Sequence, residues 1–125
     1  MIQMHVSAVA RELDARLRVI DIAGEVNLQA EQAVMGAFER ACAGIPDASV
    51  VILNFSGLEY MNSAGIGLLV SLLIRARREG VRLAACCLND HYREIFHLTR
   101  LDEHIAIFDD EAQSTRAFEH ALIQG

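Results

Sequence analysis

The sequence predicts an α/β domain in which a mixed, mostly parallel β-sheet carries helices packed on it. Apolar runs rich in β-branched residues alternate along the 125 residues with segments whose apolar side chains recur at helical spacing. The composition, 53% hydrophobic and 22% charged, is that of a folded chain rather than a disordered one. The length is typical of one domain, so we expect a single domain over residues 1–125, with the order ββαβαβαβα.

The chain opens with a predicted β-hairpin. Its strands lie around residues 3–10 and 17–23, with polar residues between them, and Gly24 ends the second strand. Asn27 is the predicted N-cap of an amphipathic helix that ends at Gly44. The apolar positions of that helix recur at helical spacing: Ala30, Val34, Ala37, Phe38 and Ala41.

A second strand–helix unit follows. Residues 49–55 form a continuous apolar run, which is typical of a central strand buried on both faces. After a loop through Met61, a helix is predicted over 63–80, with arginines in its last turns and Gly80 as its C-cap. The remaining elements are a strand over 81–88, a short helix capped by Asn89 or Asp90, a strand at 105–108 and a helix from about 110 to 123.

Charge and hydropathy exclude several classes of function. The formal net charge of −6 and a pI near 5.3 argue against nucleic-acid binding, which needs a basic face. The longest apolar run, residues 64–74, is too short to cross a bilayer, and no signal-peptide pattern opens the chain, so we expect a cytoplasmic protein without direct membrane insertion. Cys42, Cys86 and Cys87 are expected to be reduced thiols.

No motif for metal, cofactor or nucleophilic catalysis stands out. The five histidines lack the paired spacing of zinc sites, and the glycine-rich phosphate-binding motifs are missing. No GxSxG pattern surrounds a serine. We therefore predict no catalytic residue, no metal and no cofactor; a small hydrolase or ligand-binding protein that uses Ser63 with a spatially adjacent histidine is kept as an alternative.

Ser63 occupies the most informative position. A buried strand feeds a loop that delivers this serine to the first turn of a helix, where unpaired N–H groups and the positive end of the helix dipole accept a hydroxyl oxygen or a phosphate equally well. The local physics leaves two interpretations open. Ser63 is either a plain N-cap or a phosphorylation site.

The segment around Ser63 resembles the STAS domain family, specifically the bacterial anti-sigma factor antagonists. The sequence Met61-Asn62-Ser63-Ala64-Gly65-Ile66-Gly67 is similar to the Asp-Ser-Ser-Gly-Leu-Gly motif of that family, and Gly24-Glu25-Val26-Asn27 is similar to its Gly-Glu-hydrophobic-Asp turn. The resemblance covers nearly the full length. Asn62 and Asn54 stand where the family usually has acidic residues, and Arg100 where it often has glycine.

This resemblance implies a phosphorylation-switched binding module rather than an enzyme. Ser63 matches the serine that a GHKL-type anti-sigma factor kinase phosphorylates; the unmodified protein would bind this kinase and release a sigma factor, and a phosphatase would reset it. Phosphorylation adds about 1.5 to 2 negative charges. A loss of about 4 kcal/mol at an interface weakens binding roughly a thousandfold.

The predicted partner interface surrounds Ser63, in a protein expected to be a monomer or weak dimer. In the helix, Ile66, Leu69, Val70 and Leu73 are expected to face the sheet, which leaves Leu68 and Leu72 for a partner or for burial by neighbouring helices. The interface comprises Asn27, Met61, Asn62, Ser63, Ala64, Gly65, Leu68 and Leu72. The alternative is a STAS scaffold or a soluble subunit of a lipid or ABC transport complex or of a stress-signalling assembly, in which Ser63 is not phosphorylated and is only a cap.

Overall fold

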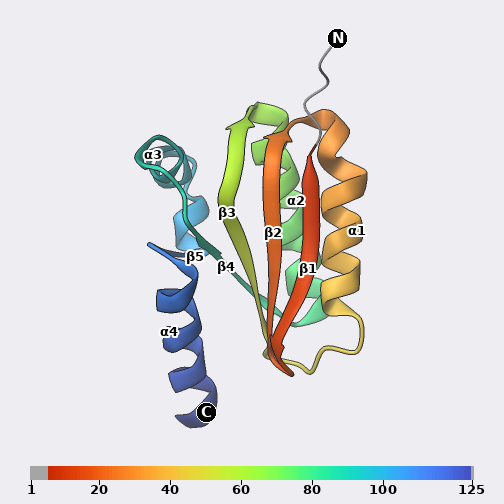
Figure 1. The fold of residues 1–125 in the computed structure, drawn as a ribbon, viewed down its shortest axis with the longest axis vertical. Helices are drawn as coiled ribbons and strands as arrows, with labels where there is room; N and C mark the ends of the chain where they lie inside the picture. The colour runs from red at the N-terminus through yellow and green to blue at the C-terminus, as the bar shows by residue number, and fades with distance from the viewer. Residues whose placement is uncertain (1–5, 125) are drawn as a thin grey trace.

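A computed structural model describes residues 6–124, and the element order ββαβαβαβα is confirmed (Figure 1). Residues 3–5 of the first predicted strand lie outside the described part. The strands and helices are β1 (Ser7–Asp14), β2 (Leu17–Val26), α1 (Glu31–Cys42), β3 (Val50–Met61), α2 (Ser63–Glu79), β4 (Arg82–Cys86), α3 (Asp90–Leu98), β5 (Ala106–Phe108) and α4 (Glu111–Gln124). Two short 3-10 helices, η1 (Leu28–Ala30) and η2 (Leu101–Glu103), precede α1 and β5.

The five strands form one sheet in the order β1-β2-β3-β4-β5. β1 is antiparallel to β2, and the other neighbouring strands are parallel, as predicted. Side chains of alternating strand residues separate the core into two parts. The larger part packs α1, α2 and α3 against one face of the sheet, and the smaller part packs α4 against the other through Phe118.

The hairpin turn is tighter than predicted. β1 continues through the polar residues to Asp14, whose carboxylate accepts hydrogen bonds from the N–H groups of Arg16 and Leu17 at 2.7 and 2.9 Å. The prediction ended β1 at residue 10 because the residues that follow are polar. β1 is an edge strand with an exposed side, where polar residues are tolerated.

β3 also runs further than predicted, because the expected loop from residue 56 to Met61 is strand. It pairs with β2 as far as Val26 and Met61, with two shifts in register on the way. Gly24 does not end β2; it sits inside the strand with a φ of 89°. Consequently β2 and β3 end side by side, and only Asn62 separates Met61 from the start of α2.

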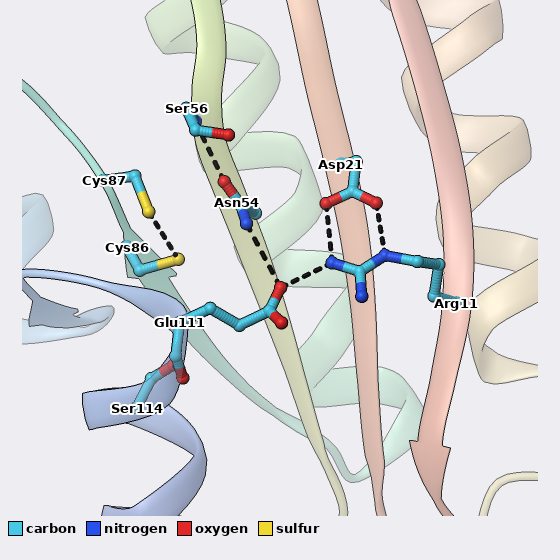
Figure 2. A network of polar contacts seen from close by, with 8 residues as sticks. All are labelled: Arg11, Asp21, Asn54, Ser56, Cys86, Cys87, Glu111 and Ser114. Atoms are coloured by element: carbon cyan, nitrogen blue, oxygen red, sulfur yellow. Dashed lines mark hydrogen bonds and ion pairs between the residues drawn. The ribbon is translucent and has the colours of Figure 1, made fainter.

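A polar network ties α4 to the sheet face (Figure 2). The Arg11 guanidinium on β1 contacts the carboxylates of Asp21 and Glu111, and these carboxylates raise the pKa of Arg11. The Asn54 amide donates to Glu111 at 3.1 Å, and its oxygen accepts from the Ser56 N–H at 2.9 Å. An asparagine suits this position because its amide can both donate and accept hydrogen bonds, whereas an aspartate would place a second carboxylate against Glu111.

Candidate functional site

The site lies at the start of α2, where two backbone N–H groups of the preceding residues donate hydrogen bonds to α3 and to β2 and so fix the chain. The Met61 N–H donates to the buried Tyr92 hydroxyl of α3 at 2.8 Å. The Asn62 N–H donates to the Val26 carbonyl, at the end of β2, at 3.3 Å. The two residues before Ser63 are therefore held from both sides, which sets the position of the first helical turn.

Gly65 lets α2 approach the end of β2 closely. A Cβ placed on this glycine would lie 2.4 Å from the Val26 carbonyl oxygen and 2.6 Å from Cγ of Met61. Both distances are far below van der Waals contact. The first turn of α2 thus needs glycine here to pack against β2, and Gly65 is buried as a result.

Asn62, not Ser63, caps the helix. Its side-chain oxygen accepts a hydrogen bond from the Gly65 N–H at 3.0 Å, and its extended backbone is that of an N-cap residue. The plain-cap interpretation of Ser63 is therefore wrong. Ser63 is the first residue of the helix, its side chain is exposed, and within the described part of the chain its hydroxyl makes no hydrogen bond.

Asn27 lies across a groove from α2 and is a helix N-cap, as predicted. Its side-chain oxygen accepts from the Gln29 N–H at 2.9 Å, and its amide donates to Glu25 at 3.2 Å. The cap begins η1, which leads directly into α1. Between this segment and α2 runs a groove of about 220 Å³, lined by Asn27, Leu28, Glu31, Ala64, Gly67, Leu68 and Ser71.

The groove brings together three of the predicted interface residues, namely Asn27, Ala64 and Leu68. Burial corrects the prediction for three apolar interface residues, Leu68 among them. Leu72 is 0% exposed and packs in the core, and Leu68 is only 7% exposed at the base of the groove. Met61 is buried as well. These side chains contribute to the position of the site rather than to an exposed partner surface.

The predicted core face of α2 is confirmed for Leu69 and in part for Ile66 and Leu73, which are partly buried against the core, and it is wrong for Val70. The buried positions are Gly65, Leu68, Leu69, Leu72 and Ala76. Val70 and Ile74, one turn apart, point outward with 42% and 50% of their surface exposed, and Leu28 on η1 is 70% exposed. The sequence analysis missed these three residues. The sequence did contain one signal for the correct face. The helix face formed by positions 65, 69, 72 and 76 carries only apolar or small residues along the whole helix, whereas the face formed by positions 66, 70 and 73 continues with the charged Arg77.

The charges around Ser63 favour an anion at its hydroxyl. Residues 63–66, the described first turn of α2, include no acidic or basic side chain. The helix is 17 residues long and has Arg77 and Arg78 in its last turn, which matches the direction of its dipole. The Ser63 oxygen therefore faces the positive end of a helix dipole, with no carboxylate in the same turn to oppose a second negative group.

The described histidines do not converge on Ser63. His91 stacks edge-on against Tyr92, His97 contacts Asp102 at 3.0 Å, and His104 contacts Arg77 at 2.8 Å. None of these three is hydrogen-bonded to Ser63, and the side chains of His5 and His120 lie outside the described part. The described residues hold no group of three or more potential metal ligands. The arrangement gives no support to the alternative of a serine hydrolase.

Comparison with known proteins defines the class. A family model for the STAS domain matches residues 8–114, so the chain belongs to the STAS domain family. The match spans β1 to the first turn of α4 and includes the whole site. Among the described residues 6–124, no helix has the length and apolar character needed to span a membrane.

Solved structures share the fold at low identity. An anti-sigma factor antagonist from Mycobacterium paratuberculosis has 19% identity over 90% of this chain and 93% of that chain, with a TM-score of 0.72. The Bacillus cell fate determinant SpoIIAA in its phosphorylated form has 20% identity over 89% and 99%, with a TM-score of 0.60. A sulfate transporter family protein from Wolinella succinogenes has 14% identity over 92% and 93%, with a TM-score of 0.72. No curated protein sequence matches this chain.

Proposed function

We propose that this protein is an anti-sigma factor antagonist, a non-enzymatic switch controlled by phosphorylation of Ser63. In its unmodified form it binds a GHKL-type anti-sigma factor kinase in the cytoplasm, and the bound sigma factor is released. Phosphorylation by the same kinase ends the complex, and a phosphatase restores it. The solved SpoIIAA structure in a phosphorylated form supports a modification of this kind on the shared fold.

The observation that carries this proposal is the freedom of the Ser63 hydroxyl. Because Asn62 caps the helix, Ser63 has no structural duty in the first turn, and its side chain is exposed. A kinase can therefore reach the oxygen without unfolding the helix. The asparagine that replaces the family's acidic residue at position 62 is itself a strong capping residue.

A phosphate on Ser63 leaves the domain folded and alters the surface. The helix dipole stabilises an added negative charge at this end by about 0.3 to 1 kcal/mol, so α2 persists. The phosphate adds charge and three acceptor oxygens at the rim of a groove whose lining already includes the carboxylate of Glu31. A partner bound to that surface must desolvate the phosphate or dissociate. The cost of desolvation lowers the affinity of the complex, so phosphorylation of one residue switches binding off.

The partner surface consists of Ser63, the groove beside Ala64, and the exposed apolar side chains of Leu28, Val70 and Ile74. These apolar residues lie on η1 and on the outward face of α2, on elements that border the groove. An apolar surface beside a polar cleft is typical of a protein-binding site. Leu28 and Val70 take the place that Leu68 and Leu72 held in the sequence-based interface.

Incubation with the cognate kinase and ATP, followed by mapping of phosphate by mass spectrometry, tests the proposal. We expect one phosphate, on Ser63, and none on the Ser63→Ala variant. Ser56→Ala is the matched control, because Ser56 is also an exposed serine, on the strand that leads to the site, and this variant should be modified like the wild type. Phosphate on another residue, or an unmodified wild-type chain, would overturn the proposal.

A second candidate function is a binding module within a membrane transport complex. The structural match to a sulfate transporter family protein, with a TM-score of 0.72, favours this possibility as strongly as the fold alone allows. Affinity isolation from cells separates the two candidates. An ATP-binding kinase-like partner supports the switch, and a transporter subunit supports the alternative.

A further inference from the structure

Two adjacent cysteines at the end of β4 have their sulfur atoms on the same side of the chain (Figure 2). In a regular strand, neighbouring side chains point to opposite faces of the sheet. Cys86 ends β4, and Cys87 leaves the strand with a φ of 70°, in the left-handed region that side-chain-bearing residues rarely adopt. This turn brings the two sulfur atoms within 3.3 Å of each other.

The two thiols have different environments. Cys86 is fully buried in the core beneath α4, beside Ala84 and Phe118, and Cys87 is only partly buried. Burial raises the pKa of the Cys86 thiol, and its contact with Cys87 raises it further. Cys87 is therefore the thiol that a dissolved reagent meets first, and Cys86 is placed to react with Cys87 rather than with solvent.

We propose that Cys86 and Cys87 form a reversible redox modification site, which closes into a disulfide on reaction with a low-molecular-weight disulfide such as oxidised glutathione. The Cys87 thiol gives its proton to water, and the resulting thiolate attacks one sulfur of the reagent, leaving a mixed disulfide on Cys87; the other sulfur leaves as a thiolate and takes up a proton to become the first thiol. Cys86 then gives up its proton and attacks the Cys87 sulfur, and the sulfur of the reagent that was bound to Cys87 leaves as a thiolate, which takes up a proton to become the second thiol. The protein loses two electrons and two protons, and the reagent gains them as two thiols.

The bond formed in this way is easily reduced. Consecutive Cα atoms are about 3.8 Å apart, whereas disulfides usually join Cα atoms about 4.4 to 6.8 Å apart. A bridge between neighbours is strained, and strained disulfides are the labile, regulatory kind rather than structural staples. The dithiol form is therefore the resting state under reducing conditions, and the disulfide forms only under oxidising conditions.

The pair is connected to the start of α3. Cys87 lies two residues before Asn89, whose side chain caps α3 by accepting from the Tyr92 N–H at 3.0 Å. The Tyr92 hydroxyl in turn accepts from the Met61 N–H. Closure changes the backbone of the segment that leads into this cap, so we expect it to alter the surroundings of Tyr92.

Mass spectrometry of the purified protein tests the closure. After treatment with oxidised glutathione and removal of the reagent, denaturation with an alkylating agent counts the free thiols. We expect the wild type to lose the mass of two hydrogen atoms and to retain one alkylatable cysteine, Cys42. Cys42→Ser should close in the same way, and Cys87→Ser should not. Three alkylatable thiols in the treated wild type, or a glutathione that stays on Cys87, would overturn the proposal.

Tyrosine fluorescence tests the connection to α3. The chain has no tryptophan and two tyrosines, so Tyr60→Phe leaves Tyr92 as the sole emitter of this kind. Tyr60 is half exposed, and its replacement spares the core. We expect the emission of this variant to change on closure and to return on reduction. Emission that stays constant through a confirmed closure would contradict the effect on Tyr92.

Discussion

Replacing Gly65 by alanine tests the close packing that positions Ser63. An added Cβ would lie 2.4 Å from the Val26 carbonyl oxygen, which belongs to the backbone of β2 and moves only with the strand. Crowding of this kind costs up to about 3 kcal/mol. Alanine in a helix gains about 1 kcal/mol over glycine, so we expect a net loss of about 2 kcal/mol in the free energy of unfolding.

Gly67→Ala is the matched control, two residues further along the same helix. Apart from its chain neighbours and the backbone of its own helix, no heavy atom of the described residues lies within 4 Å of a Cβ built at Gly67, and its position is exposed. Only the gain in helix propensity applies, so we expect this variant to be more stable by about 0.8 to 1 kcal/mol. The two substitutions are chemically identical, and they should change stability in opposite directions.

Urea unfolding followed by far-UV circular dichroism measures both changes, and thermal unfolding provides a check. At about 4 °C per kcal/mol for a domain of this size, the midpoint should fall by about 8 °C for Gly65→Ala and rise by about 4 °C for Gly67→Ala. A Gly65→Ala protein that is as stable as Gly67→Ala would refute the reasoning, because it would show that α2 does not depend on close contact with β2.

Three further predictions concern side chains near the site and at the ends of helices. Tyr92→Phe removes the acceptor of the buried Met61 N–H and should lower the free energy of unfolding by about 1 to 3 kcal/mol in urea titrations. Arg100 has a φ of 63°, so Arg100→Gly should raise stability by about 0.5 to 1 kcal/mol, and a lower melting temperature would contradict this. Burial raises the pKa of Cys42 from 9.0 to about 11; stability should therefore fall as pH rises between these values, and less so in Cys42→Ala, as urea titrations at several pH values would show.

Local pattern predicted every element of the sheet, because each strand and helix carries its own periodicity and end signals. Gly80 illustrates this: the sequence placed the end of α2 there, and the residue has the left-handed backbone of a C-cap. The second half of β3 was not predicted. Residues from Ser56 to Tyr60 are largely exposed, and only pairing with the end of β2 makes them a strand.

The outward face of α2 could not be assigned with the same ease. The run from Ala64 to Ile74 is apolar on almost every side, so periodicity over these residues alone does not fix the rotation of the helix. The close contact of Gly65 with Val26 fixes it, and it turns Val70 and Ile74 outward. The N-cap of α2 could not be assigned from the sequence either, because asparagine and serine are both good capping residues and Asn62 and Ser63 are adjacent.

Contacts between distant parts of the chain leave no local signal at all. Arg11 and Glu111 are 100 residues apart, and neither belongs to a recognisable motif. The fold places them on one face of the sheet, where Asn54 of β3 also contacts Glu111 of α4. Asn54 is then understood as a partner of Glu111, whereas the sequence alone showed it only as a departure from the family pattern.

The affinity of the protein for its kinase, measured by calorimetry with unmodified and Ser63-phosphorylated protein, tests the central claim most directly. A phosphate at the end of α2 should weaken the complex roughly a thousandfold, which corresponds to about 4 kcal/mol. Circular dichroism of the two forms should be the same, because the dipole of α2 accommodates the charge. Equal affinities for the two forms would contradict the account.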